Sequence, residues 1–539
     1  MEHLIPPTHN VTVVRPHISV TPEEREAVLR AVEYNVFAFP AALVTCDFLS
    51  DSGAAAMTDV QWAAMLRGDE SYGRNAGYYC LLDAFRDILE RPENLRERLF
   101  RDVMAGTADA AMYLATFLQP HSGGFVNGGP VQLIRPNFFI VPQGRCAEAL
   151  LFSTMADAIR TNPTVQPPII ISNGFFDTTG ANASAAGFEL HTFTQPGLTD
   201  PFPLERVRKE NPFRGNFDVA AATAFLSDPA NASRTTLVLL TITNNWAAGQ
   251  PVSMANIEAV AALARAHGMP VFFDACRFAE NAAFIKKFEP RYRDASIATV
   301  VTDMFRHADG FTISLKKDGV VNMGGALSFR DKGVFATRFG PGIGVRLKER
   351  QVAMYGNDSY GAMSGRDLMA AAAGLYQGTQ DTYLEGRLEQ VCNFAQRLEK
   401  KGIPVLLPPG GSAVFLDMDR FFAGCGRSHA DFPAVGFTLE LLREHGIRTW
   451  EAGPFSWEWD KKTTQEERDR IPNLVRLAVP RNAMTDQHFE YTAEAISRLH
   501  KKRHTIPGAR ITRGADLRMR HFQSGLEPVP VTVPRIRRL

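Results

Sequence analysis

Two segments about forty residues apart carry the side chains best suited to chemistry, Phe272-Phe273-Asp274-Ala275-Cys276-Arg277 and Ser314-Leu315-Lys316-Lys317-Asp318. In each segment a run of apolar and β-branched residues ends abruptly in charge. This pattern predicts two buried strands, one with Asp274 at its carboxyl end and the next followed by Lys317. An Asp and a Lys at adjacent strand ends suit pyridoxal phosphate (PLP). The lysine amine forms a Schiff base with its aldehyde, and the carboxylate keeps its ring nitrogen protonated.

Other polar residues fall near the same predicted strand ends. Arg277 follows Asp274 by three residues, and Ser314 precedes Lys317 by three. Gln143-Gly144-Arg145 comes just before a predicted helix, where backbone N–H groups and a guanidinium form a phosphate site. Taken singly, Asp274 and Lys317 are better explained as a strand cap and a surface lysine, and Gln143-Gly144-Arg145 is weak evidence because it also suits an ordinary turn. Their combination favours a cofactor site.

The elements that would position these residues alternate between strand and helix. Strands are predicted at 168–171, 236–243, 270–274, 311–315 and 324–329. Crossover helices between them, such as 253–267, indicate a mostly parallel sheet, which binds ligands at the carboxyl ends of its strands. Residues 75–160 are predicted to be mostly helical. Beyond about 335, a long helix (365–401) and short strands (403–407, 412–417, 473–479) predict a smaller α+β domain.

Composition excludes several classes of protein. The 539 residues are 45% apolar and 22% charged with a net charge of +1, so neither nucleic acid nor an anionic membrane is expected as a partner. Six scattered cysteines without a CxxC motif favour reduced thiols and a cytoplasmic location. No signal peptide and no membrane span are expected, because the N-terminus lacks an apolar core and no apolar run approaches eighteen residues.

These motifs resemble the β-eliminating lyases of aromatic amino acids, tryptophanase and tyrosine phenol-lyase, from about residue 35 to about 522. The most specific stretches are Asp51-Ser52-Gly53 with Gln61-Trp62-Ala63, Gly68-Asp69-Glu70 with Tyr72, Gly249 to Ser253, Asp274 to Lys286, and Lys316 to Gly325. The resemblance implies an α/β fold-type I PLP-dependent enzyme, similar to aspartate aminotransferase. It implies an N-terminal arm (1–60) that contributes to the small domain and to subunit contacts, a large PLP-binding domain (61–335) and a small domain (336–522). The Pro- and Arg-rich end of the chain shows no periodicity, which predicts a mobile tail (523–539).

The resemblance also implies a role for each matching residue around the cofactor. Lys317 would form the Schiff base and take the α-proton, and Asp274 would pair with the ring nitrogen. The other expected cofactor contacts are Arg277 and Asn245 at the phenolic oxygen, Gln143, Gly144, Arg145 and Ser314 at the phosphate, and Phe176 on the ring face. Arg476, a charge inside an apolar strand pattern, would bind the carboxylate of a small amino-acid substrate, helped by Ser50.

Further implied roles depend on a neighbouring copy of the chain. Tyr72 matches a catalytic tyrosine that acts across a subunit boundary and protonates the leaving group. Gly53, Glu70 and Asn322 match a potassium site between subunits. A homo-oligomer, expected to be a tetramer, follows from these matches.

Three positions favour tryptophanase over tyrosine phenol-lyase: Asp177, His521 and Ala452. Asp177 and His521 would be catalytic, and Ala452 replaces an arginine that phenol-lyases direct at the phenol ring. Trp246, Ala248 and the divergent segment 454–470 depart from the family and leave the side-chain pocket open.

The expected reaction is α,β-elimination that converts L-tryptophan and water to indole, pyruvate and ammonia. Tyrosine phenol-lyase and cysteine-conjugate β-lyase remain alternatives, and an aminotransferase is a more distant one. A non-catalytic paralogue is disfavoured, because it would have no need to retain Lys317, Asp274, Arg145 and Arg476 together.

Overall fold

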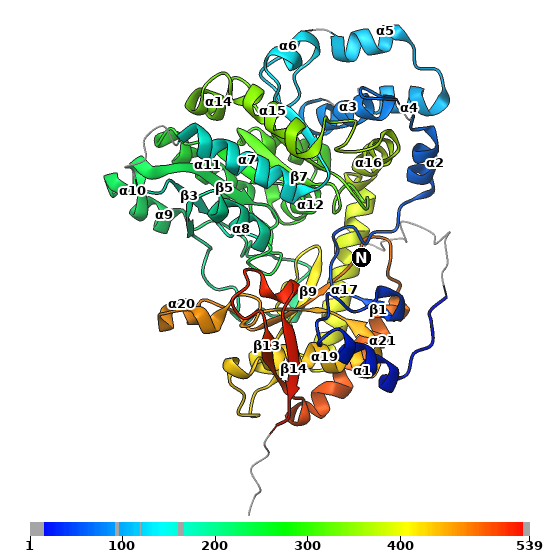
Figure 1. The fold of residues 1–539 in the computed structure, drawn as a ribbon, viewed down its shortest axis with the longest axis vertical. Coiled ribbons are helices and arrows are strands. Elements are labelled where there is room, and N and C mark those ends of the chain that lie inside the picture. The colour runs from blue at the N-terminus through cyan, green and yellow to red at the C-terminus, as the bar shows by residue number, and fades with distance from the viewer. Residues whose placement is uncertain (1–15, 70, 92–95, 119, 160–165, 532–539) are drawn as a thin grey trace, which may run out of the picture. The chain divides into compact units, whose positions relative to one another are not determined.

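The computed structural model describes residues 16–69, 71–91, 96–118, 120–159 and 166–531 (Figure 1). The chain forms two compact units. Unit 1 contains Ser52–Leu198 and Lys209–Leu388, and unit 2 contains the described parts of Val11–Asp51, Thr199–Arg208 and Glu389–Leu539. The buried hydrophobic clusters of unit 1 are separate from those of unit 2.

Unit 1 is built on a seven-stranded sheet. Its strands are β2 (Phe138–Val141), β3 (Ile169–Ser172), β4 (Glu189–Thr192), β5 (Thr235–Thr241), β6 (Val271–Asp274), β7 (Gly310–Ser314) and β8 (Gly325–Phe329). They lie in the order β2-β8-β7-β6-β5-β3-β4, and β8 runs in the opposite direction to the other six strands. The mostly parallel sheet predicted from the sequence is therefore confirmed.

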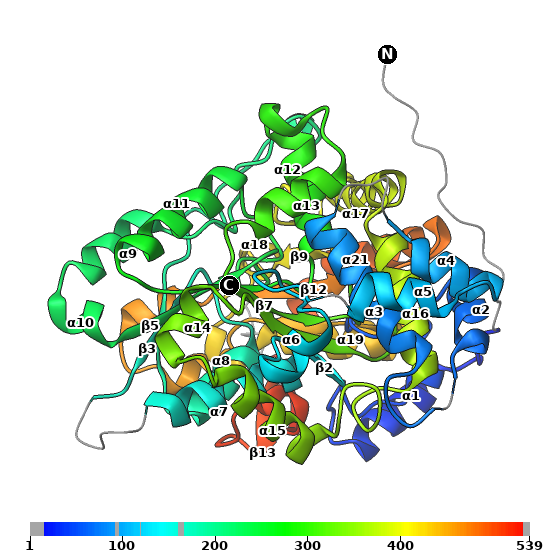
Figure 2. The same cartoon turned by 90° about the horizontal axis from the view of Figure 1, so that it is seen from above.

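Alternating side chains of the strands enter two separate cores, as a sheet covered on both faces requires. Phe273 and Leu240 pack in one core, with α3 (Ala76–Glu90), α11 (Met254–Ala266), α12 (Phe278–Phe288), α13 (Ile297–Phe305) and α16 (Gly365–Gly378). Phe272 and Leu239 pack in the other, with α7 (Gly144–Ile159), α14 (Val334–Phe339) and α15 (Ile343–Tyr355). Figure 2 shows these helices around the sheet from above.

Strand β2 lies inside a stretch predicted to be mostly helical. All four of its residues are buried, so the run Phe138–Val141 has no polar–apolar alternation to mark it as a strand. At the sheet edge, side chains take the place of a neighbouring strand. The N–H of Ile140 donates to Asp358 (2.9 Å), and the Gln351 amide donates to the carbonyl of Ile140 (2.5 Å).

The helix predicted over 365–401 is two helices, α16 and α17 (Asp381–Lys400). Two glycines of α16 allow it to pack directly on the loop after Lys317. A Cβ on Gly374 would lie 1.9 Å from the carbonyl oxygen of Gly319, and one on Gly378 would lie 2.1 Å from that of Asp318. This packing explains why residues 336–388 belong to unit 1. The sequence pattern predicts a boundary between the large and small domains near residue 335.

Unit 2 contains a three-stranded antiparallel sheet, β11 (Trp450–Ala452), β12 (Leu474–Ala478) and β9 (Ala413–Asp417). Its other helices and strands include α1 (Pro22–Ala31), α19 (Pro433–His445), α21 (Asp486–Lys501), and the short pair β1 (Cys46–Asp47) and β10 (Ile447–Arg448). Strand β14 (Gly525–Val529) pairs with β13 (Gly508–Arg513), although the sequence pattern shows no periodicity there. Residues 532–539 of the predicted mobile tail lie outside the described residues.

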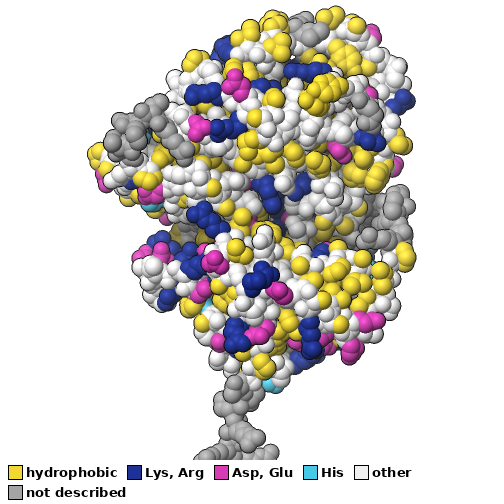
Figure 3. Space-filling view, viewed as in Figure 1, with side chains coloured by type: hydrophobic (Ala, Val, Ile, Leu, Met, Phe, Trp, Pro, Cys, Tyr) yellow, Lys and Arg dark blue, Asp and Glu magenta, His cyan; other side chains and the backbone are white. Residues whose placement is uncertain are grey.

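Acidic and basic side chains are interspersed on the face of the molecule in Figure 3, in agreement with the small net charge. Among the described residues, no helix is both long and apolar enough to cross a membrane. The six cysteines all lie among the described residues, and none of them is joined in a disulfide.

Candidate active site

The carboxyl ends of the central strands bring the predicted Asp and Lys to one edge of the sheet. Thr241, Asp274 and Thr312 are register partners on β5, β6 and β7. Lys317 follows the end of β7 by three residues and is half-buried. The charges of Asp274 and Lys317 both act on the Cys276 thiol, whose pKa is raised to about 12 by burial first and then by Asp274. Asp274 and Lys317 therefore both lie within electrostatic reach of the Cys276 thiol.

Backbone contacts fix the loop that carries Lys317. The carboxylate of Asp318 accepts the N–H of Ala279 (2.8 Å) in the first turn of α12, where the helix dipole favours negative charge. The N–H of Gly53 donates to the carbonyl of Lys316 (2.9 Å), and the buried Gln61 amide donates to that of Val320 (3.0 Å). These contacts fix the backbone before and after Lys317, which restricts the positions that its amine can reach.

Residues 143–145, at the beginning of α7, and Ser314, at the end of β7, lie close together and form a small cradle. A Cβ on Gly144 would lie 2.8 Å from Cβ of Ser314, so only glycine lets the backbone approach this closely. The Ser314 hydroxyl is buried and has no hydrogen-bond partner among the described residues. Nζ of Lys316 donates to Oε1 of Gln143 (3.0 Å). Burial, followed by the charges of Lys317 and Arg145, lowers the pKa of Lys316 to about 8.

The turn after β3 and the loop after β5 lie side by side. Phe176 is the N-cap of α8 (Asp177–Ala185), and both Phe176 and Asp177 are half-buried. A Cβ on Gly174, two residues earlier, would touch Cβ of the half-buried Trp246 at 2.7 Å. Oδ1 of the neighbouring Asn245 is buried without a hydrogen-bond partner among the described residues. Trp246 therefore borders the segment that leads into Phe176.

These observations fit PLP. A glycine cradle at a helix N-terminus, beside an unsatisfied serine hydroxyl, is suited to a phosphate. An unsatisfied buried amide oxygen at Asn245 indicates a missing polar partner. Arg277, the N-cap of α12, is buried directly after the strand that carries Asp274. The closely packed Gly144, the Ser314 hydroxyl and the Asn245 amide are therefore suited to hold the cofactor.

Unit 2 contains the predicted carboxylate-binding residues. Arg476, in the middle of β12, is 4% exposed and forms an ion pair with Asp51 at 2.7 Å. The other oxygen of Asp51 bonds Arg481 at 3.2 Å. Ser50 directly precedes Asp51 and is half-buried. This network orients the guanidinium group of Arg476, which the sequence pattern indicated only as a charge inside an apolar strand.

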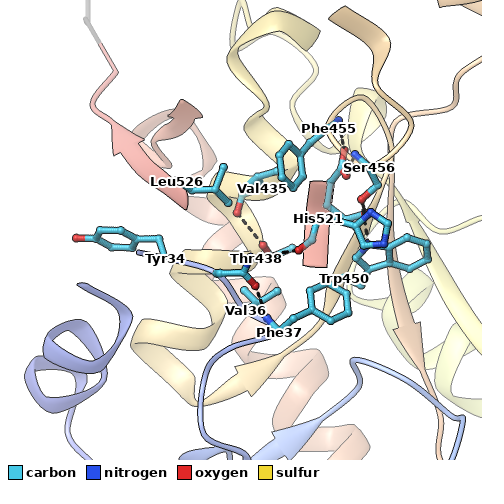
Figure 4. A pocket seen from close by; sticks show the side chains of 12 residues that line it. Tyr34, Val36, Phe37, Val435, Thr438, Trp450, Phe455, Ser456, His521 and Leu526 are labelled. Carbon is cyan, nitrogen blue, oxygen red and sulfur yellow. Dashed lines mark hydrogen bonds between the residues drawn. The ribbon is translucent and has the colours of Figure 1, made fainter. Parts of the chain in front are cut away.

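His521 lies in a small aromatic pocket of unit 2 (Figure 4). Its ring centroid is 5.5 Å from that of Trp450 and 5.6 Å from that of Phe37. The indole N–H of Trp450 donates to the Ser456 hydroxyl (3.0 Å). Ala452, two residues beyond Trp450 on β11, is also buried. His521 and Ala452 therefore belong to neighbouring parts of the same unit.

The residues expected at a subunit boundary are only partly described. Tyr72 is 79% exposed, and its ring centroid lies 4.0 Å from that of Tyr360. The side-chain amide of Asn322 donates to the carbonyl of Gly53 (2.9 Å), so these two predicted potassium ligands are in contact. Glu70 lies outside the described residues. Among those described, no three His, Cys, Asp or Glu side chains could hold a metal ion together.

The sequence interpretation missed several residues that support the site. Asp318 directly follows Lys317, and Asp51 lies in a motif that was recognised without a role for its carboxylate. Glu148, one helical turn after Arg145, is buried between α7 and α8. Spacing places Glu148 on the same side of α7 as Arg145, but nothing local shows that its carboxyl is enclosed.

The fold is that of fold-type I PLP enzymes. It matches aspartate aminotransferase from Thermotoga maritima (TM-score 0.50, 13% identity, covering 90% of this chain and 98% of that one). It also matches threonine aldolase from Leishmania major (TM-score 0.50, 14% identity, 84% and 99%).

The chain belongs to the beta-eliminating lyase family, whose signature matches residues 47–495, and it is therefore a lyase. It is 34% identical to tryptophanase from Rhodobacter capsulatus, over 94% of this chain and 95% of that protein. It is 32% identical to tyrosine phenol-lyase from Lacrimispora saccharolytica, over 94% of each.

Proposed function

We propose that this enzyme uses PLP to convert L-tryptophan and water to indole, pyruvate and ammonia. The observation that carries the choice of substrate is Asp177. Its carboxylate begins α8 directly after Phe176, where the helix dipole favours a negative charge. A carboxylate at the edge of the proposed ring site can move a proton at the indole ring, which must be protonated before it leaves.

The other proposed roles follow from chemistry and position. PLP, when bound, withdraws electrons from the α-carbon of the substrate. Lys317 binds the cofactor and accepts the α-proton, Asp274 keeps the ring nitrogen protonated, and Asn245 and Arg277 hold the phenolic oxygen. Gln143, Gly144, Arg145 and Ser314 hold the phosphate. Arg476, with Ser50, binds the substrate carboxylate. Tyr72 and His521 assist departure of the leaving group.

Changing Asp177 to Ala is expected to lower turnover of L-tryptophan by roughly 10²–10⁴, the usual contribution of a positioned acid or base. Turnover of an S-alkylcysteine should change far less, since a thiolate leaves without ring protonation. Pyruvate release from both substrates and indole release from tryptophan measure this difference. Asp177→Asn is the matched control, because it keeps the size of the side chain and removes the carboxylate. Equal losses on both substrates would contradict the assigned role.

Trp246 supports a second candidate, a β-lyase for smaller side chains. Its half-buried indole borders the segment leading to Phe176 and would leave less room for a substrate ring. The wild-type enzyme should be assayed for pyruvate with L-tryptophan, L-tyrosine and S-alkylcysteine. Indole from L-tryptophan supports the first proposal. Efficient pyruvate release from S-alkylcysteine alone would replace it with the β-lyase, and phenol from L-tyrosine would replace it with tyrosine phenol-lyase.

We also propose a potassium-activated homotetramer in the cytoplasm. Exposed apolar side chains on α2 (Asp59–Arg67), Val60, Trp62 and Leu66, together with the exposed Tyr72, offer a surface for a second copy. Activity is expected to be higher in potassium than in sodium, with a tetramer in sedimentation analysis. A fully active monomer, or activity unaffected by exchanging the two ions, would contradict this proposal.

A further inference from the structure

Glu148 is a buried carboxyl group that none of the roles above uses. It lies on α7 three residues after Arg145 and is 5% exposed. Its carboxyl oxygens bond only uncharged groups of α8: the hydroxyls of Thr179 (2.5 Å) and Thr178 (3.3 Å) and the amide of Asn182 (3.3 Å). Among the described residues, no Lys, Arg or His forms an ion pair with Glu148. A buried carboxylate without a paired cation is costly, so such a group tends to keep its proton.

The charged groups that act on Glu148 come from the strand ends of the candidate site. Burial first and then the charge of Asp274 raise the pKa of Glu148 to about 7, while hydrogen bonds from Thr179 and Asn182 and the charge of Lys317 act in the opposite direction. The Cys276 thiol also senses both Glu148 and Asp274. Glu148 therefore lies within electrostatic reach of the carboxylate proposed to pair with the cofactor ring.

Charged residues of the other helices packed on α7 are engaged elsewhere. Those of α14 and α15 that form hydrogen bonds are Arg338 with the carbonyls of Gly268 and Thr235, Arg346 with that of Phe339, Arg350 with Asp157, and Lys348 with Asp358. Two acidic residues remain: Asp177 begins α8, and Asp274 ends β6. The charge of Asp274 has the same sign as that of an ionised Glu148, so it favours the protonated form of Glu148.

We propose that Glu148 is a positioning residue that keeps its proton while buried between α7 and α8, within electrostatic reach of Asp274. The protonated Glu148 also joins α7, which begins at the phosphate cradle, to α8, which begins beside Phe176. The assignment of Asp274 to a cofactor rests on the proposed function. The proton on Glu148 is a property of the cofactor-free chain and can be measured without cofactor.

The first test is the pH dependence of unfolding of the cofactor-free protein. A carboxyl whose pKa is about 7 when folded and 4.5 when unfolded stabilises the fold fully below pH 4.5. That stability is lost as the pH rises through 7. Glu148→Gln cannot lose a proton, so its free energy of unfolding should rise relative to wild type across this interval. A difference independent of pH would overturn the proposal.

Glu90→Gln is a matched control in unit 1, because the contribution of Glu90 to the free energy of unfolding depends on pH in the opposite direction. Hydrogen bonds from His121 and the Phe125 N–H help to lower the pKa of Glu90, so its stabilisation is lost as the pH falls. If Glu148→Gln does not fold, Thr179→Val provides the test. Loss of the hydroxyl donor should raise the pKa of Glu148. The infrared band of its protonated carboxyl should therefore persist to higher pH than in the wild type. An unchanged infrared titration would overturn the proposal.

The second test measures PLP affinity of wild type and Glu148→Gln from about pH 6 to pH 8.5. The protonated cofactor ring beside Asp274 should lower the pKa of Glu148, so wild-type affinity should rise relative to that of the variant as pH increases. The expected change is about tenfold for each unit of pKa shift. A constant ratio would remove the link to Asp274. Failure of wild type to bind PLP would refute the proposed function, while the cofactor-free titration would still decide whether Glu148 carries the proton.

Discussion

Changing Lys317 to Ala is expected to abolish turnover and to leave no borohydride-reducible bond between chain and cofactor. The wild-type protein should be yellow when purified with PLP and should lose that visible band on reduction. The reason is chemical: a Schiff base needs a primary amine, and of the two lysines after β7, Lys316 already donates to Gln143, so the amine of Lys317 is the one assigned to the cofactor. Absorption spectra and mass spectrometry of the reduced protein measure the result.

Lys316→Ala is the matched control, because it removes an adjacent lysine from the same loop. Nζ of Lys316 donates to Gln143, so we assign it to the phosphate cradle. This variant should keep the reducible bond and lose part of its affinity for PLP. If Lys316→Ala loses the bond and Lys317→Ala retains it, the assignment of the two lysines is wrong.

Changing Arg476 to Ala should lower kcat/KM for amino-acid substrates by roughly 30- to 4,000-fold, the equivalent of about 2–5 kcal/mol for a buried charge pair. The proposed carboxylate contact would be lost, and no neighbouring residue on β12 carries a charge to replace it. Steady-state kinetics on PLP-saturated enzyme measure the loss. The variant should also be less stable, because Asp51 loses one of its arginines.

Arg481→Ala separates binding from stability. Arg481 is 1% exposed and bonds the same Asp51, so its removal should cost comparable unfolding free energy, about 3–5 kcal/mol. Its kcat/KM should fall by less than about tenfold if Arg476 alone contacts the substrate. Equal kinetic losses in the two variants would mean that the network, and not Arg476 itself, controls activity.

The sequence by itself located five of the seven strands of the sheet and the residues at its edge. Strands β3, β5, β6, β7 and β8 are short apolar runs bounded by polar residues, and local pattern is enough to locate them. Asp274 ends one such run, and Lys317 lies three residues beyond another. Because parallel strands present their carboxyl ends at one edge, order along the chain was sufficient to predict that the two residues lie at the same edge of the sheet.

Other features of the fold and the site depend on contacts between residues that are distant in the sequence, so only the tertiary structure decided them. Strand β2 is recognisable only from its pairing with β8, and the packing of α16 on the Lys317 loop depends on Gly374 and Gly378 meeting distant carbonyls. Asp51 and Arg476 are separated by 425 residues, so their ion pair has no local signal. The same holds for Glu148, whose proton depends on enclosure by α8 and on the charge of Asp274. Burial and long-range electrostatics arise only when the chain is folded, since both depend on neighbours that the sequence does not place side by side.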